Sequence, residues 1–120
     1  MKKTSIFLTG GRGMVGKNIL EHPAAAQYDI IAPTSKELDL TDFAATQRYM
    51  NSIKPDIVIH SAGLVGGIQA NMANPVDFLV TNMDLGRNVI MAARQAGVPK
   101  LINLASSCMY PRNAPNPLSE

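Results

Sequence analysis

A chain of 120 residues is long enough for one folded domain and too short for a second of similar size. It is 46% hydrophobic and 17% charged, with a net charge of +2 and no lysine or arginine run, which argues against disorder and against a nucleic-acid partner. No stretch approaches the roughly 20 apolar residues that cross a bilayer, and the single cysteine, Cys108, favours a reducing, cytoplasmic location. We therefore expect neither nucleic acid nor membrane as a partner.

Short apolar runs predict strands at residues 5–9, 28–32, 56–60 and 100–104, and helical spacing predicts helices at 13–21, 43–53 and 75–96. Asp42, Pro75 and Gly97 stand at helix ends, where these residue types are common. This alternation predicts an α/β fold, a Rossmann-type parallel sheet with helices on both faces. Met83 and Met91 of the third helix are expected to pack in the core.

The segment LTGGRGMVG at positions 8–16 carries four glycines between the first strand and the first helix. A glycine loop in this place predicts a dinucleotide site, because Gly10 allows a tight turn, Gly13 admits a pyrophosphate and Gly16 permits close packing of the helix. The helix N-terminus favours phosphate groups. A glycine-rich turn without a ligand is the alternative. The residues expected to bind the cofactor here are Gly10, Gly11, Arg12, Gly13, Met14, Val15 and Gly16.

The end of the second strand predicts which nicotinamide cofactor is bound. A carboxylate there would bind the 2′-hydroxyl of NAD, whereas a cation favours the 2′-phosphate of NADP. The run PTSK at 33–36 has no carboxylate, and Arg12 and Lys36 can supply positive charge, so NADP(H) is favoured. Arg12 and Lys36 could instead be solvated surface cations, since such cations are common.

The glycine spacing resembles the short-chain dehydrogenase/reductase superfamily, particularly its extended branch, which modifies sugar nucleotides. That resemblance implies adenine contacts from Asp39 and Leu40, and space for the cofactor at the small residues Ala62 and Gly63. Asp39 could equally be a turn residue before the helix, and Ala62–Gly63 an ordinary turn after a strand.

Two longer motifs narrow the resemblance. They are VGGIQAN at 65–71, followed by NPVDF at 74–78 and Asn82, and SSCMYP at 106–111. Together they are similar to the GDP-L-fucose synthase family, whose members are NADP-dependent 3,5-epimerase/4-reductases of GDP-4-keto-6-deoxy-D-mannose. The similarity extends over essentially all 120 residues. In this family an arginine follows the second strand, and this chain has Ser35 in its place. Ser35 and Lys36 are both expected to contact the cofactor.

The resemblance also implies roles at the end of the fourth strand. Alignment on Tyr110 and Pro111 places Ser106 where the superfamily has a serine that hydrogen-bonds the substrate carbonyl. Cys108 matches the family's cysteine acid/base, which serves the removal and return of a proton beside a ketone. On base rates alone a lone cysteine is more often a small buried hydrophobe. Cofactor contacts are also implied for Leu104, Ala105, Ser106 and Ser107.

Parts of the family pattern do not occur in this sequence. Tyr110 has Ala114, not lysine, four residues on, so the Tyr-x-x-x-Lys pair, a second acid/base histidine and most of the GDP-sugar domain are expected beyond residue 120. We therefore expect residues 1–120 to be the N-terminal part of an NAD(P)-binding domain, truncated after about four strands and inactive alone. The fourth strand should be an exposed edge or lie beside the first. A homodimer is expected for the complete enzyme.

Two other functions stay open. One is another NAD(P)-dependent nucleotide-sugar epimerase or dehydratase, and the other is a non-catalytic dinucleotide-binding module. No metal site is expected, because His60 has no cysteine or carboxylate nearby at ligand spacing. His60 is expected in the core or at a sheet edge.

Overall fold

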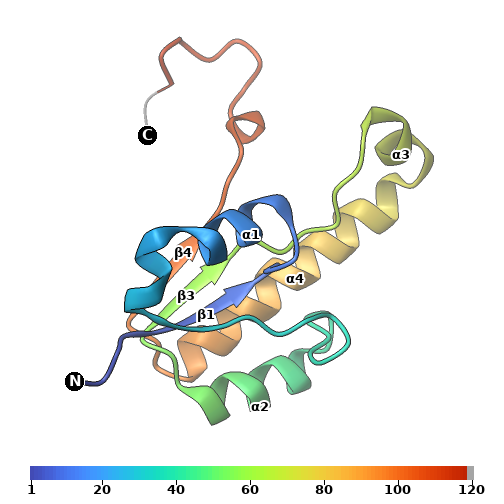
Figure 1. Ribbon diagram of the computed structural model, residues 1–120. Helices are drawn as coiled ribbons and strands as arrows, with labels where there is room; N and C mark the ends of the chain where they lie inside the picture. Colours follow the sequence, from blue (N-terminus) through green and yellow to red (C-terminus); the bar gives the residue numbers. More distant parts are fainter. Residues whose placement is uncertain (119–120) are drawn as a thin grey trace.

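A four-stranded parallel sheet forms the centre of the computed structural model, which describes residues 1–118 (Figure 1). The strands lie in the order β2-β1-β3-β4. Their bounds are β1 (Ser5–Thr9), β2 (Asp29–Ile31), β3 (Ile57–His60) and β4 (Lys100–Asn103). The predicted strands are confirmed. β4 is an edge strand beside β3, and the alternative place beside the first strand is wrong. The last two residues of the predicted 1–120 domain, Ser119 and Glu120, lie outside the described residues.

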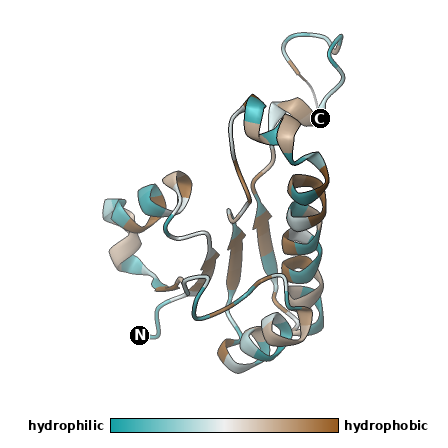
Figure 2. Ribbon diagram, turned by 90° about the vertical axis from the view of Figure 1, so that its right-hand side faces the viewer, coloured by the Kyte–Doolittle hydropathy of each residue, from teal (hydrophilic) through white to brown (hydrophobic). Residues whose placement is uncertain are grey.

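Helices cover both faces of the sheet, as predicted (Figure 2). One face carries α1 (Met14–Glu21) and the short 3-10 helix η1 (Pro23–Gln27), and the other carries α2 (Phe43–Ile53) and α4 (Pro75–Gln95). Three short elements were not predicted: η1, α3 (Ile68–Ala73) and η2 (Ser107–Met109). They are too short for apolar periodicity to reveal them.

Local side-chain and backbone chemistry explains where the long helices begin and end. The Asp42 carboxylate accepts the Ala45 N–H at 3.0 Å and caps α2. α4 begins at Pro75, and the chain leaves it at Gly97, whose φ of 70° is a conformation that glycine adopts without strain. The N–H of Val98 then donates to the Ala93 carbonyl at 3.0 Å. These caps are the ones expected from the sequence.

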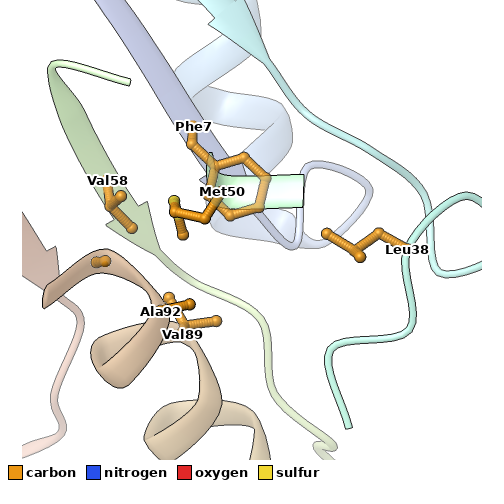
Figure 3. Close-up of a cluster of buried hydrophobic side chains, with 7 residues drawn as sticks. Phe7, Leu38, Met50, Val58, Val89 and Ala92 are labelled. Carbon is orange, nitrogen blue, oxygen red and sulfur yellow. The ribbon is translucent and has the colours of Figure 1, made fainter. Parts of the chain in front are cut away.

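The main core lies between the sheet and the α2–α4 layer (Figure 3). Phe7 of β1 and Val58 of β3 pack there against Met50 of α2 and Val89 of α4, all with no exposed surface. The core-facing stripe of α4 also contains Ala92 and Ala93. Met83 and Met91 do not belong to this stripe and are 63% and 36% exposed, so the expectation that they pack in the core was wrong.

Candidate functional site

The carboxyl ends of β1, β2 and β3 border a cleft of about 500 Å³ between the loops that follow them and α4. In an open parallel sheet this edge is where ligands bind. The lining residues are Phe7, Thr9, Gly10, Gly11, Arg12, Gly13, Pro33, Thr34, Ser35, Leu38, Asp39, Leu40, Thr41, Ala62, Gly63, Leu64, Thr81 and Leu85.

Two glycines allow the loop after β1 to fold tightly over the sheet. Gly10 has a φ of 72°, and a Cβ there would lie 2.8 Å from the backbone of Ala62. A Cβ on Gly16 would lie 2.1 Å from the Gly10 carbonyl oxygen. Gly16 therefore allows the close packing expected of the helix, and the partner of α1 in this contact is the glycine loop itself.

The N-terminus of α1 points its backbone donors toward this loop. Gly13 is the N-cap and has no capping side chain; its N–H donates to the Gly10 carbonyl at 2.9 Å. The N–H groups of the following turn have no intrahelical partner, as at every helix start. Such groups, with the helix dipole, form a site for phosphate oxygens.

The loop after β2 holds a carboxylate that sequence reasoning missed. Glu37 turns back so that its Oε2 accepts the Thr34 N–H at 2.7 Å. The hydrogen bonds from Thr34 lower the pKa of Glu37, and the positive charge of Arg12 lowers it further. Arg12 thus lies within electrostatic reach of the loop that follows β2, although Glu37 comes 25 positions after Arg12 in the sequence. Lys36 is exposed and does not line the cleft.

Asp39 takes part in a turn and also lines the cleft. Its Oδ1 accepts the Thr41 hydroxyl at 2.6 Å and the Thr41 N–H at 2.9 Å. These bonds lower the pKa of Asp39. The turn interpretation of Asp39 is therefore confirmed, while Leu40 beside it lines the cleft.

A buried hydrogen-bond network forms the floor of the cleft where β1 and β3 end. The Thr9 Oγ1 accepts the N–H groups of Ser61 and Ala62, each at 3.1 Å, and lies 2.7 Å from the Nδ1 of His60. With two donors already on the oxygen, the Thr9 hydrogen is the one left for His60. Burial lowers the pKa of His60. His60 is therefore a core residue, as expected.

Several predicted site residues do not line the cleft. These are Met14, Val15, Gly16, Lys36, Leu104, Ala105, Ser106 and Ser107. Val15 faces an apolar hollow of about 540 Å³ on the opposite side of the sheet. Ser106 and Cys108 lie beyond β4, where the Ser106 Oγ accepts the Cys108 N–H at 3.2 Å. Cys108 is exposed and borders a separate hollow with Tyr110 and Arg112, so it does not have the surroundings of a small buried hydrophobe.

Sequence reasoning missed the α4 side of the cleft. Thr81 and Leu85 come from the middle of that helix and line the cleft beside Leu64. Asn82 Oδ1 accepts the Leu64 N–H at 2.8 Å, and its Nδ2 donates to the Leu64 carbonyl at 2.9 Å. The sequence signal for this contact is the place of Asn82 in the family motif that follows NPVDF at 74–78.

Known proteins are similar to this chain in sequence. A model of the NAD dependent epimerase/dehydratase family matches residues 6–120. The chain belongs to that family. Among curated relatives, it is 51% identical over 115 residues to a GDP-L-colitose synthase of Yersinia pseudotuberculosis, covering 96% of this chain and 37% of the relative. It is 47% identical over 119 residues to a GDP-L-fucose synthase of Azorhizobium caulinodans, covering 99% of this chain and 38% of the relative.

A solved structure is similar to this chain in fold. A GDP-mannoheptose C4 reductase from Campylobacter jejuni with NADP bound superimposes with a TM-score of 0.89 at 32% identity, covering 99% of this chain and 35% of that one. The chain thus spans a little over a third of the length of each of these three proteins. Within residues 1–118, no helix has both the length and the apolar character to span a membrane.

Proposed function

We propose that this chain is the cofactor-binding part of an NADP(H)-dependent nucleotide-sugar epimerase/reductase that converts GDP-4-keto-6-deoxy-D-mannose to GDP-L-fucose. The observation that carries the proposal is the cleft at the carboxyl end of the sheet, whose lining joins the glycine loop to the loops after β2 and β3. The 47% identity to a GDP-L-fucose synthase over nearly the whole chain supports the reaction.

The residues of the cleft fit a dinucleotide. A Cβ at Gly10 or Gly16 would collide with backbone, so the glycines allow the loop to pack tightly against the start of α1. The N–H groups of the first turn of α1 are the proposed donors to a pyrophosphate. Arg12, placed near the loop after β2, is the proposed partner of a 2′-phosphate, with Ser35 at the cleft wall. When bound, NADP(H) would supply the hydride for reduction. The NADP in the Campylobacter reductase supports this choice.

The proposed chemistry at the sugar uses residues beyond β4. Ser106 would hydrogen-bond the substrate carbonyl, and the Cys108 thiol would exchange protons at the carbons beside it. Both residues follow the carboxyl end of β4. The glycine loop follows the carboxyl end of β1, at the same end of this parallel sheet. Leu104, Ala105 and Ser107 would contact the cofactor from the same segment.

The same proposal includes a homodimer in a cytoplasmic setting. Four apolar side chains of α4 follow one line at helical spacing and are exposed: Val76 (67%), Leu79 (62%), Met83 (63%) and Ile90 (43%). Such a stripe suits packing against the equivalent helix of a second copy. The exposed thiol of Cys108 is compatible with a reducing compartment.

Titration of the 120-residue chain with NADPH and NADH tests the cofactor. We expect saturable binding of NADPH and binding of NADH weaker by about tenfold or more, because a phosphate paired with a guanidinium forms strong charge-assisted hydrogen bonds. Arg12→Ala should remove most of this preference, and Lys17→Ala, which changes a cation of α1 outside the cleft lining, should keep it. Equal affinity for both dinucleotides would contradict the NADP(H) assignment.

A second candidate reaction is synthesis of GDP-L-colitose, favoured by the 51% identity to a GDP-L-colitose synthase. Product analysis of the whole protein that carries this sequence, with the 4-keto-6-deoxy and 4-keto-3,6-dideoxy GDP-sugars as substrates, separates the two. Turnover of another nucleotide sugar alone would favour a different epimerase or dehydratase. Dinucleotide binding without turnover of any substrate would favour a non-catalytic module.

A further inference from the structure

Two asparagines of α4 each hold one wall of the cleft. We propose that Asn82 and Asn88 are positioning residues, which place the walls for the two halves of the dinucleotide without touching it. This inference rests on the proposed function, since it concerns how the same cleft binds NADP(H).

Asn82 holds the loop after β3. Its amide forms a two-point contact with the backbone of Leu64, with the Oδ1 accepting at 2.8 Å and the Nδ2 donating at 2.9 Å. The Nδ2 also donates to the Phe78 carbonyl of α4 itself at 2.8 Å, which fixes the orientation of the amide. A Cβ on Gly63 would lie 3.3 Å from the Asn82 Oδ1. The amide therefore lies directly against the segment that lines the cleft.

Asn88 holds the loop after β2. Its Nδ2 donates to the carbonyls of Leu40 and Thr41 at 2.9 and 3.0 Å, and its side chain has no exposed surface. Both carbonyls belong to residues that line the cleft. Two backbone acceptors more than 40 residues away along the chain are thus satisfied by one side chain of α4.

The order of the strands assigns each wall to one half of the ligand. The glycine loop follows β1 in the middle of the cleft, the wall held by Asn88 follows β2, and the wall held by Asn82 follows β3 on the other side. With a pyrophosphate at the α1 N-terminus, the adenosine ribose lies toward the end of β2. The wall held by Asn82 is then left for the nicotinamide half.

α4 is suited to this task because it is fixed along the sheet. Val89, Ala92 and Ala93 anchor it in the core, and Figure 1 shows it running past β1 and β3. A wall held by a rigid element loses less freedom when a ligand binds, which strengthens binding. Loss of either amide should therefore weaken the binding of the ligand half that its wall contacts.

The test compares two ligands by calorimetric titration of the 120-residue chain: NADPH, and adenosine 2′,5′-bisphosphate, which lacks the nicotinamide half. Asn82→Ala should weaken NADPH binding about five- to tenfold, as expected for the loss of one or two hydrogen bonds that order a wall, and leave the bisphosphate within about twofold. Asn88→Ser, which keeps one hydroxyl donor in the buried position, should weaken both ligands alike, about fivefold.

Asn71→Ala is the matched control. The Asn71 amide donates to the carbonyls of Gly66 and Gly67 at 3.0 and 3.1 Å, and neither glycine lines the cleft. We expect both ligands to bind this variant as they bind the wild type. A variant that only loses stability would show a lower melting temperature and, at temperatures where it is folded, would bind both ligands with wild-type affinity.

The assignment of Asn82 is overturned if Asn82→Ala weakens both ligands equally or neither of them. The assignment of Asn88 is overturned if Asn88→Ser binds both ligands like the wild type, or if it does not fold, because Asn88 is then a core residue and nothing more. A wild-type chain that binds neither ligand contradicts the proposed function itself, and is thus distinct from these outcomes.

Discussion

At the scale of single residues, the pair of Thr9 and His60 organises the floor of the cleft. Thr9 joins the end of β1 to the turn after β3 by accepting two N–H groups, and its hydroxyl donates to His60. This bond requires a lone pair on the Nδ1 of His60. The neutral imidazole is therefore the form that the folded state needs, in agreement with the burial that lowers its pKa.

This arrangement makes stability depend on pH in a defined window. Between the lowered pKa of folded His60 and its ordinary value of 6.5, the unfolded chain binds a proton that the folded chain does not. The free energy of unfolding should therefore fall as pH is lowered below about 6.5, before the carboxylates titrate. Urea unfolding between about pH 7 and pH 5 measures this dependence.

His60→Gln should flatten the pH dependence, because glutamine can accept the Thr9 hydrogen and carries no titrating group. Asn51→Gln, at an exposed and non-titrating position of α2, is the control and should leave the dependence as it is in the wild type. An unchanged pH dependence in His60→Gln would show that the buried pair is not its source.

At the scale of elements, the contact between α1 and the loop after β1 depends on a single missing side chain. The neighbours of a Cβ at Gly16 are the backbone atoms of Gly10 and Gly11, the nearest at 2.1 Å. Backbone cannot move aside as a flexible side chain could. Any side chain at position 16 must therefore displace the helix or the loop.

Gly16→Ala should lower the free energy of unfolding by about 1–3 kcal/mol, the usual cost of overpacking, and abolish measurable NADPH binding. Gly67→Ala is the matched control, since Gly67 has a φ of −68° and open space around its Cβ position. Its cost should be about 1 kcal/mol or less, because alanine is only a poorer N-cap than glycine, and this variant should bind NADPH like the wild type. Urea unfolding measures both, and equal stabilities would contradict the close contact.

At the scale of the whole molecule, α4 serves two surfaces. Its inner side carries the core and the cleft wall, while the stripe of Val76, Leu79, Met83 and Ile90 is exposed. Gly86 lies on the same stripe with nothing within 4 Å of its Cβ position. A neighbouring helix could approach closely there, which is compatible with the proposed dimer.

Sedimentation velocity over a range of concentrations tests that surface. The wild-type chain should self-associate, and the double substitution Leu79→Glu with Met83→Glu should weaken this by about tenfold or more, because charges would be buried without partners. Leu20→Glu, at a 40% exposed position of α1, is the control and should leave association unchanged. A wild-type chain that stays monomeric would argue against this stripe as the interface.

The sequence by itself determined the features whose causes are local. The apolar runs of the four strands, the Asp42 cap, the Gly97 turn and the glycine loop all depend on residues next to one another, and the structure has them where they were predicted. The Rossmann-type order of elements follows from their alternation along the chain.

Only the tertiary structure decided how distant segments share the cleft. Asn82 and Asn88 contact the loops after β3 and β2 only because α4 packs beside those loops. The charge of Arg12 acts on Glu37 only because the loops that follow β1 and β2 lie near each other. Conversely, Val15 adjoins the glycine loop in sequence but faces the other side of the sheet. Sequence spacing defines which residues lie on one element, whereas packing between elements defines which side chains meet.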